Sequence, residues 1–334
     1  MKILITGAAG GIGSLICESL SENYELFLVD NFRNGFRENL PGYEIHEIDI
    51  CSDEFIKYTC QIMPDVILHL AAITSLPDCE SNKVECINVN VSGTVNVLEA
   101  ARYANVNKVI FASTSAIYEN NSQNEAPFKE DITAKPLLFY SLSKKMAEEI
   151  CHSYIENYNM NIMILRFFNI FGPNQDNKRK SPPLLNYLVK SVLKNEQPLL
   201  HSDGNQRRDY VSAYDLVELM KLILENKNFE SQCYNISSGI TLSVKDIIKM
   251  VEDTLDTKAN PIFRSPSMLW DSYPLLFETK KPLNKNVITK EANKFSLGCN
   301  EKLFQKFGWK PNIDFENEFK KVIVKLSQRI KNEI

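Results

Sequence analysis

The chain has 334 residues, and its 38 lysines and arginines nearly balance 42 aspartates and glutamates, for a net charge of -4. A single hydrophobic core stops growing near roughly 250 to 300 residues, so we expect one large domain with a smaller second lobe. Basic residues are scattered apart from the run KRK at 178–180, which argues against nucleic acid as a partner. With no signal-peptide pattern, no apolar stretch of about 18 residues and no CxxC pair, the sequence predicts a cytoplasmic protein with no membrane partner.

Short apolar runs rich in branched residues recur along the first half of the chain and read as strands. They lie at 2–6, 25–29, 66–70, 108–112 and 162–167. The segments between them are long enough for helices, and 89–102 and 143–158 carry the strongest helical periodicity. Near-continuous apolar strands that alternate with helices predict the α/β class, with a parallel sheet covered on both faces.

The composition of the sequence changes after Phe171. The polar segment GPNQDNKRKSPP, which ends in two prolines, favours neither a strand nor a helix. A late apolar run at 233–236 is expected to return to the first sheet as a strand. We therefore predict a first domain over 1–172 with a return segment near 211–240. The smaller, discontinuous lobe would comprise 173–210 and 241–334.

A glycine-rich turn follows the first strand and precedes a predicted helix that runs to about Asn23. Its glycines are Gly7, Gly10, Gly11 and Gly13. Glycines at such a turn let the backbone approach a pyrophosphate, while the N-H groups of the helix amino terminus face the anion. The spacing is GxxGxxG rather than GxGxxG, but its place between strand and helix predicts a dinucleotide site in a Rossmann-type, doubly wound sheet.

An acidic residue closes the second predicted strand. Asp30 stands 17 residues after Gly13, where a carboxylate accepts hydrogen bonds from ribose hydroxyls and repels a 2′-phosphate. We therefore expect NAD as the cofactor. Arg33 lies close enough in sequence to leave a phosphate contact open.

The run YSLSK places Tyr140 and Lys144 one turn apart on the same face of a predicted helix. A neighbouring cation favours the phenolate form of a tyrosine. Such a tyrosine is a proton acceptor suited to oxidation of an alcohol.

Nine segments in order carry a resemblance to a known family: GAAGGIG, VDNFRNG, DI at 49–50, HLAA at 69–72, NVSGTVNVLEAAR, STSAIY, YSLSK, RFFNIFGP and DGNQRRDYVSAYD. With them the chain resembles the extended short-chain dehydrogenases/reductases, in their nucleotide-sugar epimerase and dehydratase branch, and most resembles UDP-glucose 4-epimerases. The resemblance covers nearly the whole chain. It implies an NAD cofactor, a nucleotide-sugar substrate and a homodimer formed through helices around 84–104 and 143–158.

The resemblance also implies roles for particular residues. Thr114, Tyr140 and Lys144 would be catalytic, with Thr114 chosen by its distance from the IY of STSAIY. The cofactor would contact Gly7, Gly10, Gly11, Ile12, Gly13, Asp30, Asn31, Asn34, Asp49, Ile50, Leu70, Ala71, Ala72, Thr74, Asn90, Tyr140, Lys144 and Phe168. The substrate would contact Ser75, Thr114, Asn169 and Arg208. Lys290 stands about where the family tends to place a second arginine for the substrate diphosphate, and no metal site is predicted.

One departure from the family decides between reaction types. Dehydratases and decarboxylases of the family carry acidic residues after the catalytic threonine, whereas this chain has Ser115 and Ala116. We therefore expect epimerisation of the nucleotide sugar, with inversion at C4 through a transient 4-keto sugar. The alternatives are inversion at another carbon, a dehydrogenase or reductase that releases its keto product, and a non-catalytic NAD-binding sensor or scaffold.

Overall fold

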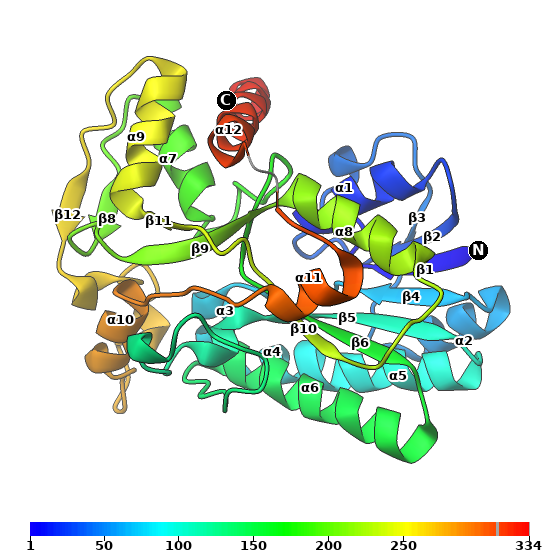
Figure 1. Ribbon diagram of the computed structural model, residues 1–334. Helices are drawn as coiled ribbons and strands as arrows, with labels where there is room; N and C mark the ends of the chain where they lie inside the picture. The colour runs from blue at the N-terminus through cyan, green and yellow to red at the C-terminus, as the bar shows by residue number, and fades with distance from the viewer. Residues whose placement is uncertain (312–313, 334) are drawn as a thin grey trace.

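The computed structural model describes residues 1–311 and 314–333. Its largest element is a seven-stranded sheet in which every pairing is parallel (Figure 1). In spatial order the strands are β10 (Cys233–Ile236), β6 (Ile162–Phe167), β5 (Lys108–Thr114), β4 (Val66–His69), β1 (Lys2–Thr6), β2 (Glu25–Asp30) and β3 (Ile45–Glu47). The predicted fold class is confirmed.

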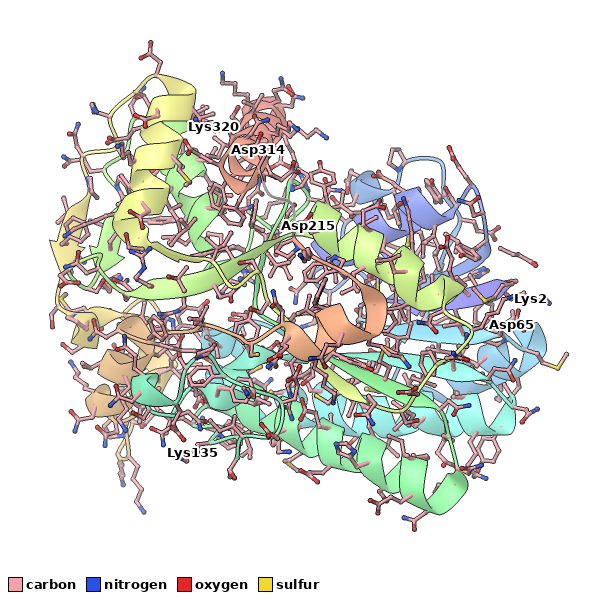
Figure 2. The ribbon with its side chains drawn as sticks, in the orientation of Figure 1. Lys2, Asp65, Lys135, Asp215, Asp314 and Lys320 are labelled. Atoms are coloured by element: carbon pink, nitrogen blue, oxygen red, sulfur yellow. The ribbon has the colours of Figure 1, made fainter. Side chains whose placement is uncertain are left out.

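The strands predicted from sequence are all present, with small differences at their ends. β5 continues to Thr114, and β4 ends at His69. The late strand β10 pairs with β6 in parallel, so the chain does return to the first sheet after its excursion. At the start of β1, the backbone N-H of Lys2 donates to the carboxylate of Asp65 over 2.8 Å, a neighbouring pair visible in Figure 2.

Helices cover both faces of the sheet, and each layer buries its own core. The helices on one face are α2 (Asp53–Ile62), α5 (Gly93–Tyr103) and α6 (Phe139–Tyr158), and those on the other are α1 (Gly11–Leu20), α8 (Ala213–Glu225) and α11 (Glu301–Phe307) (Figure 1). Near-continuous apolar strands such as β1 are buried from both sides, which is why they do not alternate with polar residues.

Two smaller sheets and their helices come mostly from the second half of the chain. The mixed sheet has the order β11 (Thr241–Ser243), β9 (Arg207–Ser212), β7 (Asn169–Phe171), and a two-stranded sheet pairs β12 (Ile262–Arg264) with β8 (Leu199–His201). A separate core there joins α7 (Leu184–Leu193), α9 (Val244–Leu255) and α12 (Phe315–Glu333). The exact domain boundaries given above stay a prediction.

Two helices differ from their predicted bounds near the site. The predicted helix at 89–102 begins as η2 (Asn88–Ser92), a π-helical turn that follows α3 (Leu76–Ser81) and α4 (Lys83–Ile87) and leads into α5. Helix α6 begins at Phe139 rather than 143, because glutamates accept its first N-H groups: Glu119 from Leu138 (2.6 Å) and Glu80 from Phe139 (2.7 Å). Among the described residues, no helix is long and apolar enough to cross a membrane.

The remaining elements are short. They are helix α10 (Lys285–Ala292) and the 3-10 turns η1 (Arg37–Asn39), η3 (Ser115–Tyr118), η4 (Gln123–Glu125), η5 (Pro266–Met268) and η6 (Pro274–Leu276).

Candidate active site

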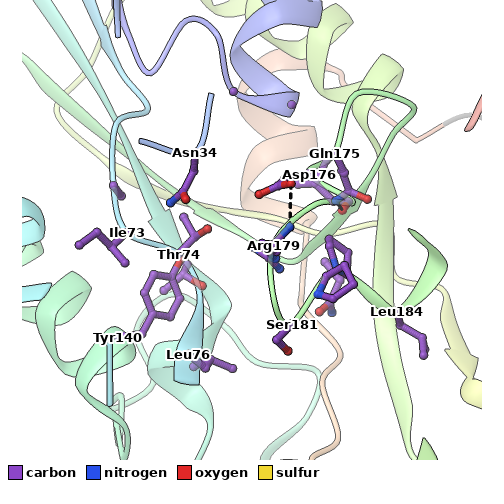
Figure 3. A pocket seen from close by; sticks show the side chains of 18 of the residues that line it. Asn34, Ile73, Thr74, Leu76, Tyr140, Gln175, Asp176, Arg179, Ser181 and Leu184 are labelled. Atoms are coloured by element: carbon purple, nitrogen blue, oxygen red, sulfur yellow. Dashed lines mark hydrogen bonds between the residues drawn. The ribbon is translucent and has the colours of Figure 1, made fainter. Parts of the chain in front are cut away.

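A cavity of about 930 Å³ opens at the carboxyl ends of β1, β4 and β5, under segments from the second half of the chain (Figure 3). The residues that line it come from the glycine turn, from the loop after β4, from the end of β5, from α6 and from the loop between β7 and α7. Ligands of open parallel sheets bind at this edge, because the strand ends and helix amino termini meet there.

The glycine turn forms one end of the cavity and leaves no space for side chains. Gly7 has φ 71°, a left-handed conformation that suits glycine, and a Cβ there would lie 2.8 Å from the backbone nitrogen of Ala71. A Cβ on Gly11 would lie 2.6 Å from the carbonyl oxygen of Asn174, in the β7–α7 loop. The glycines therefore let the turn pack directly against the loop after β4 and the β7–α7 loop. The helix amino terminus that follows lines the cavity and suits an anion such as a pyrophosphate.

Asp30 lies at the end of β2, on the cavity wall. Its carboxylate accepts hydrogen bonds from the N-H groups of Ala9 (3.0 Å) and Phe32 (2.8 Å), so it also holds the glycine turn against β2. Arg33 lines the same wall, but its guanidinium forms an ion pair with Glu85. Arg33 is thus already partnered, which leaves the carboxylate of Asp30, among the residues that the structure describes, as the unpaired charge on this wall of the cavity.

Tyr140 and Lys144 lie one turn apart on α6, beside Thr114 at the end of β5. Burial raises the pKa of Tyr140 to about 12, while the hydroxyl of Thr114 and the charge of Arg179 act in the opposite direction. Burial lowers the pKa of Lys144 to about 8, so its ammonium is still mostly protonated at pH 7. The protein alone does not make the phenolate, so a further positive charge, such as an oxidised nicotinamide, is needed beside it.

The hydroxyl oxygen of Thr114 accepts the backbone N-H of Ala116 over 3.1 Å, which begins η3. The hydroxyl proton is not used in this bond, and it can be donated toward Tyr140, whose pKa the Thr114 hydroxyl lowers. Beneath this strand end lies a buried network that sequence reasoning missed. The carboxylate of Glu148, one turn after Lys144 on α6, accepts from the hydroxyl of Ser113 (2.5 Å) and from two nitrogens of Arg166.

Asn169 and Arg208, which were predicted to contact a substrate, also line the cavity. The guanidinium of Arg208 donates to the carbonyl oxygen of Glu291 over 3.0 Å, at the end of α10. Lys290 is different: its ammonium bonds the side chain of Asn120 at the surface, and it is not among the residues that line the cavity. Lys290 thus lies outside the cavity that Asn169 and Arg208 line.

The structure brings most of the predicted site residues to this one cavity. Those that line it are Gly7, Gly10, Gly11, Ile12, Gly13, Asp30, Asn31, Asn34, Ile50, Leu70, Ala71, Ala72, Thr74, Thr114, Tyr140, Lys144, Phe168, Asn169 and Arg208.

Three predicted site residues, Asp49, Ser75 and Asn90, do not line the cavity. Asp49 accepts from the side chain of Asn31 (2.9 Å), behind the cavity wall. The buried amide of Asn90 is occupied by both backbone groups of Ile73 and by Ser143, so it holds the loop after β4 against α6. Ser75, at the end of this loop and directly before α3, is buried.

The lining residues that sequence reasoning missed include Arg179, Trp270 and Tyr273. Figure 3 shows Arg179, in the β7–α7 loop, directed into the same cavity as Tyr140. The only sequence signal for it was the basic run KRK, which by itself is usually a solvated surface. Trp270 and Tyr273 lie in a segment without periodicity.

Comparison with known proteins agrees with this geometry. Residues 3–237 match the family described as the NAD dependent epimerase/dehydratase family. This match spans well over half of the chain, so the chain belongs to that family.

Individual relatives are similar over nearly their whole length. A protein of Methanocaldococcus jannaschii, provisionally named UDP-glucose 4-epimerase, is 29% identical over 96% of this chain and 97% of its own. The dTDP-D-glucose 4,6-dehydratase of Mus musculus is 28% identical over 96% of this chain and 87% of its own.

Two solved structures are also similar. The UDP-glucose 4-epimerase of Thermotoga maritima with UDP-glucose has a TM-score of 0.85 at 25% identity, covering 99% of this chain and 100% of that one. The UDP-glucuronic acid 4-epimerase of Bacillus cereus, in complex with UDP-glucuronic acid and NAD, has a TM-score of 0.82 at 25% identity, covering 100% of each chain.

Proposed function

We propose that the protein is an NAD-dependent 4-epimerase of a nucleotide sugar. The observation that carries the proposal is the arrangement of one cavity, with a glycine turn and Asp30 at one end and Thr114 beside Tyr140 within it. A dinucleotide at the first group and a sugar at the second would bring the sugar alcohol to the nicotinamide. Solved relatives with UDP-glucose, or with UDP-glucuronic acid and NAD, support this assignment.

NAD would be held by backbone N-H groups at the start of α1, where the glycine turn lines the cavity, and by the carboxylate of Asp30. When bound, NAD accepts a hydride from the sugar C4 and returns it. The pairing of Arg33 with Glu85 supports NAD over NADP, because Arg33 is not a free cation for a 2′-phosphate.

The chain's own residues would move the proton. Tyr140 takes the proton of the C4 hydroxyl and later gives it back, while Thr114 donates a hydrogen bond to the same oxygen. Bringing the tyrosine from a pKa of about 12 to neutral pH needs more positive charge beside it. Lys144, on the same face of α6, and the oxidised nicotinamide, when bound, would supply that charge together. Return of the hydride to the opposite face of the 4-keto sugar inverts C4 and leaves no net redox change.

Epimerisation is favoured over dehydration by the residues that follow Thr114. Ser115 is buried and Ala116 has no acid-base group. Among the described residues, the carboxylates that line the cavity are Asp30, Asp176, Asp271 and Glu291. None of them lies on the β5–η3 segment beside Thr114, where the dehydratases of the family carry theirs.

The test is to incubate the NAD-loaded protein with UDP-, GDP-, CDP- and dTDP-sugars and to follow C4 inversion by NMR. A substrate deuterated at C4 should give an epimer that keeps its deuterium, because the hydride leaves and returns within one site. Solvent hydrogen at C5 would instead indicate a dehydratase, and accumulation of free NADH would indicate a dehydrogenase.

A further inference from the structure

Unpartnered polar groups gather at one end of the cavity. Six buried side-chain nitrogen or oxygen atoms lack a hydrogen-bond partner among residues 1–311 and 314–333. Three of them are Nε of Arg179 and the hydroxyl oxygens of Ser75 and Tyr273. Arg179 and Tyr273 line the cavity, and Ser75 lies between two residues that line it. Buried polar groups in native proteins are nearly always paired, so a cluster of unpaired ones at a cavity points to a ligand.

The chemistry of the three groups is that of an anion site. Arg179 is a cation, and in the described part of the chain it forms no ion pair and donates no hydrogen bond from its side chain. Burial and the neighbouring carboxylate of Asp78 raise the pKa of Tyr273 to about 12, while the charge of Arg179 and the hydroxyl of Ser75 act in the opposite direction, so the phenol stays protonated and is a donor. A guanidinium fork with two hydroxyl donors matches the planar, bidentate geometry of a carboxylate.

Two acidic residues lie near Arg179, and neither replaces such a ligand. The carboxylate of Asp176 accepts hydrogen bonds from the backbone N-H groups of Lys178 (2.8 Å) and Arg179 (3.1 Å), and these bonds shape the loop. The dashed line in Figure 3 marks the bond between Asp176 and Arg179. Asp78 lies on α3 and influences the pKa of both Arg179 and Tyr273 without forming an ion pair with the guanidinium. They offset part of the arginine's charge but leave its donors free.

The position of the cluster decides which part of the substrate it would meet. Leu76 and Leu138, the latter two residues before Tyr140, pack with Trp270 and Tyr273 in one small core. The cluster is thus on the Tyr140 side of the cavity, where the sugar ring reacts. Arg208, on strand β9, also lines the cavity and would bind the diphosphate.

We propose that Arg179, with Ser75 and Tyr273, forms a subsite for a carboxylate on the sugar ring, so that the substrate class is a nucleotide-linked uronic acid. This inference rests on the proposed function, because it assumes that the sugar lies beside Tyr140. Arg179 is the specificity-determining residue of the subsite. Its charge selects the acidic sugar over its neutral counterpart.

The test measures binding by calorimetry of UDP-glucuronic acid, UDP-glucose and UDP to the NAD-loaded protein. We expect the wild type to bind UDP-glucuronic acid about 10- to 100-fold tighter than UDP-glucose, as a hydrogen bond to a charged group allows. Arg179→Gln should abolish this preference and leave the affinity for UDP-glucose within about threefold. Arg179→Lys should keep part of it, because the charge remains without the fork.

Lys178→Gln is the matched control, because it removes an exposed cation from the same loop. The ammonium of Lys178 lies against the ring of Phe36, and Lys178 is not among the residues that line the cavity. It should change neither affinity. Equal wild-type affinities for the acidic and neutral sugars would overturn the subsite. If Arg179→Gln lost affinity for UDP-glucose as much as for UDP-glucuronic acid, the arginine would bind the diphosphate. If it lost affinity for NAD, the arginine would bind the cofactor. Either result overturns the proposal.

The binding data also separate this inference from the proposed function. Selective binding of UDP-glucuronic acid without C4 inversion would contradict the epimerase and leave the subsite standing. Inversion of UDP-glucose with no preference for the acid would contradict only the subsite. Failure of the wild type to bind any of the three compounds would contradict both.

Discussion

The carboxylate of Glu148 receives two nitrogens of the Arg166 guanidinium, at 2.9 Å and 2.8 Å, in the layer between α6 and β6. Both side chains are almost completely buried. Glu148 also accepts the hydroxyl of Ser113, the neighbour of Thr114, and Arg166 donates to the hydroxyl of Tyr118 over 2.6 Å. The pair therefore ties the helix that carries Tyr140 to the strand that carries Thr114.

Removing one partner of this pair should be costly. Glu148→Ala leaves a buried guanidinium without its counter-charge, so we expect the free energy of unfolding to fall by about 3 to 5 kcal/mol in urea titrations. Glu218→Ala is the control, because it breaks the surface pair with Lys221 and should cost under about 1 kcal/mol. Similar losses in the two variants would mean that the buried pair contributes no more than a surface pair.

Tyr140→Phe tests the proton acceptor. The ring and its packing remain, but the hydroxyl that exchanges the C4 proton is gone, so turnover should fall by roughly 10² to 10⁴. Affinities for NAD and for the nucleotide sugar should be retained, which titration calorimetry can check. Turnover close to the wild-type rate would assign the proton transfer to another group.

The carboxylate of Asp30 should make the protein prefer NAD. Fluorescence titration of both cofactors should give at least about tenfold tighter binding of NAD, since a 2′-phosphate would meet a negative charge. Arg33→Ala should leave that preference in place, because Arg33 is paired with Glu85. Equal or tighter binding of NADP would contradict the role of Asp30.

Lys144 should make stability depend on alkaline pH. Its pKa falls from an ordinary 10.5 to about 8 on burial, so between these values the unfolded chain binds more protons than the folded one. The cost of the buried charge is fully present below pH 8 and is relieved as the pH rises toward 10.5. The free energy of unfolding of the wild type, minus that of Lys144→Met, should therefore rise from pH 8 to pH 10. A flat difference would show that Lys144 titrates normally.

A homodimer through α5 and α6 is expected to bury apolar residues that are now exposed. Leu142 and Met146 lie one turn apart on α6 and are each 39% exposed. If they form the interface, Met146→Glu should convert a dimer to a monomer in sedimentation velocity experiments. Leu275→Glu, on an apolar residue that is 74% exposed in η6, should leave the dimer unchanged. A wild-type monomer would contradict the expectation.

Local sequence patterns were enough to predict the sheet, the glycine turn and the positions of Tyr140 and Lys144. Each depends on backbone periodicity or on a conformational demand that few residue types meet. Strand periodicity located β1 and β6 at their observed bounds, and Gly7 stands at a turn with positive φ. A YxxxK spacing on a helix fixes which face both side chains share, whatever the rest of the fold does.

Tertiary structure alone decided which partner each polar side chain has. Asn90 holds Ile73, although it was expected to contact the cofactor, and Lys290 bonds Asn120 at the surface. Arg179, in a loop without periodicity, is directed into the cavity without a counter-ion among the described residues. The physical reason is that a polar side chain follows hydrogen bonds and charges on segments far away in sequence, and these are set only when the layers pack.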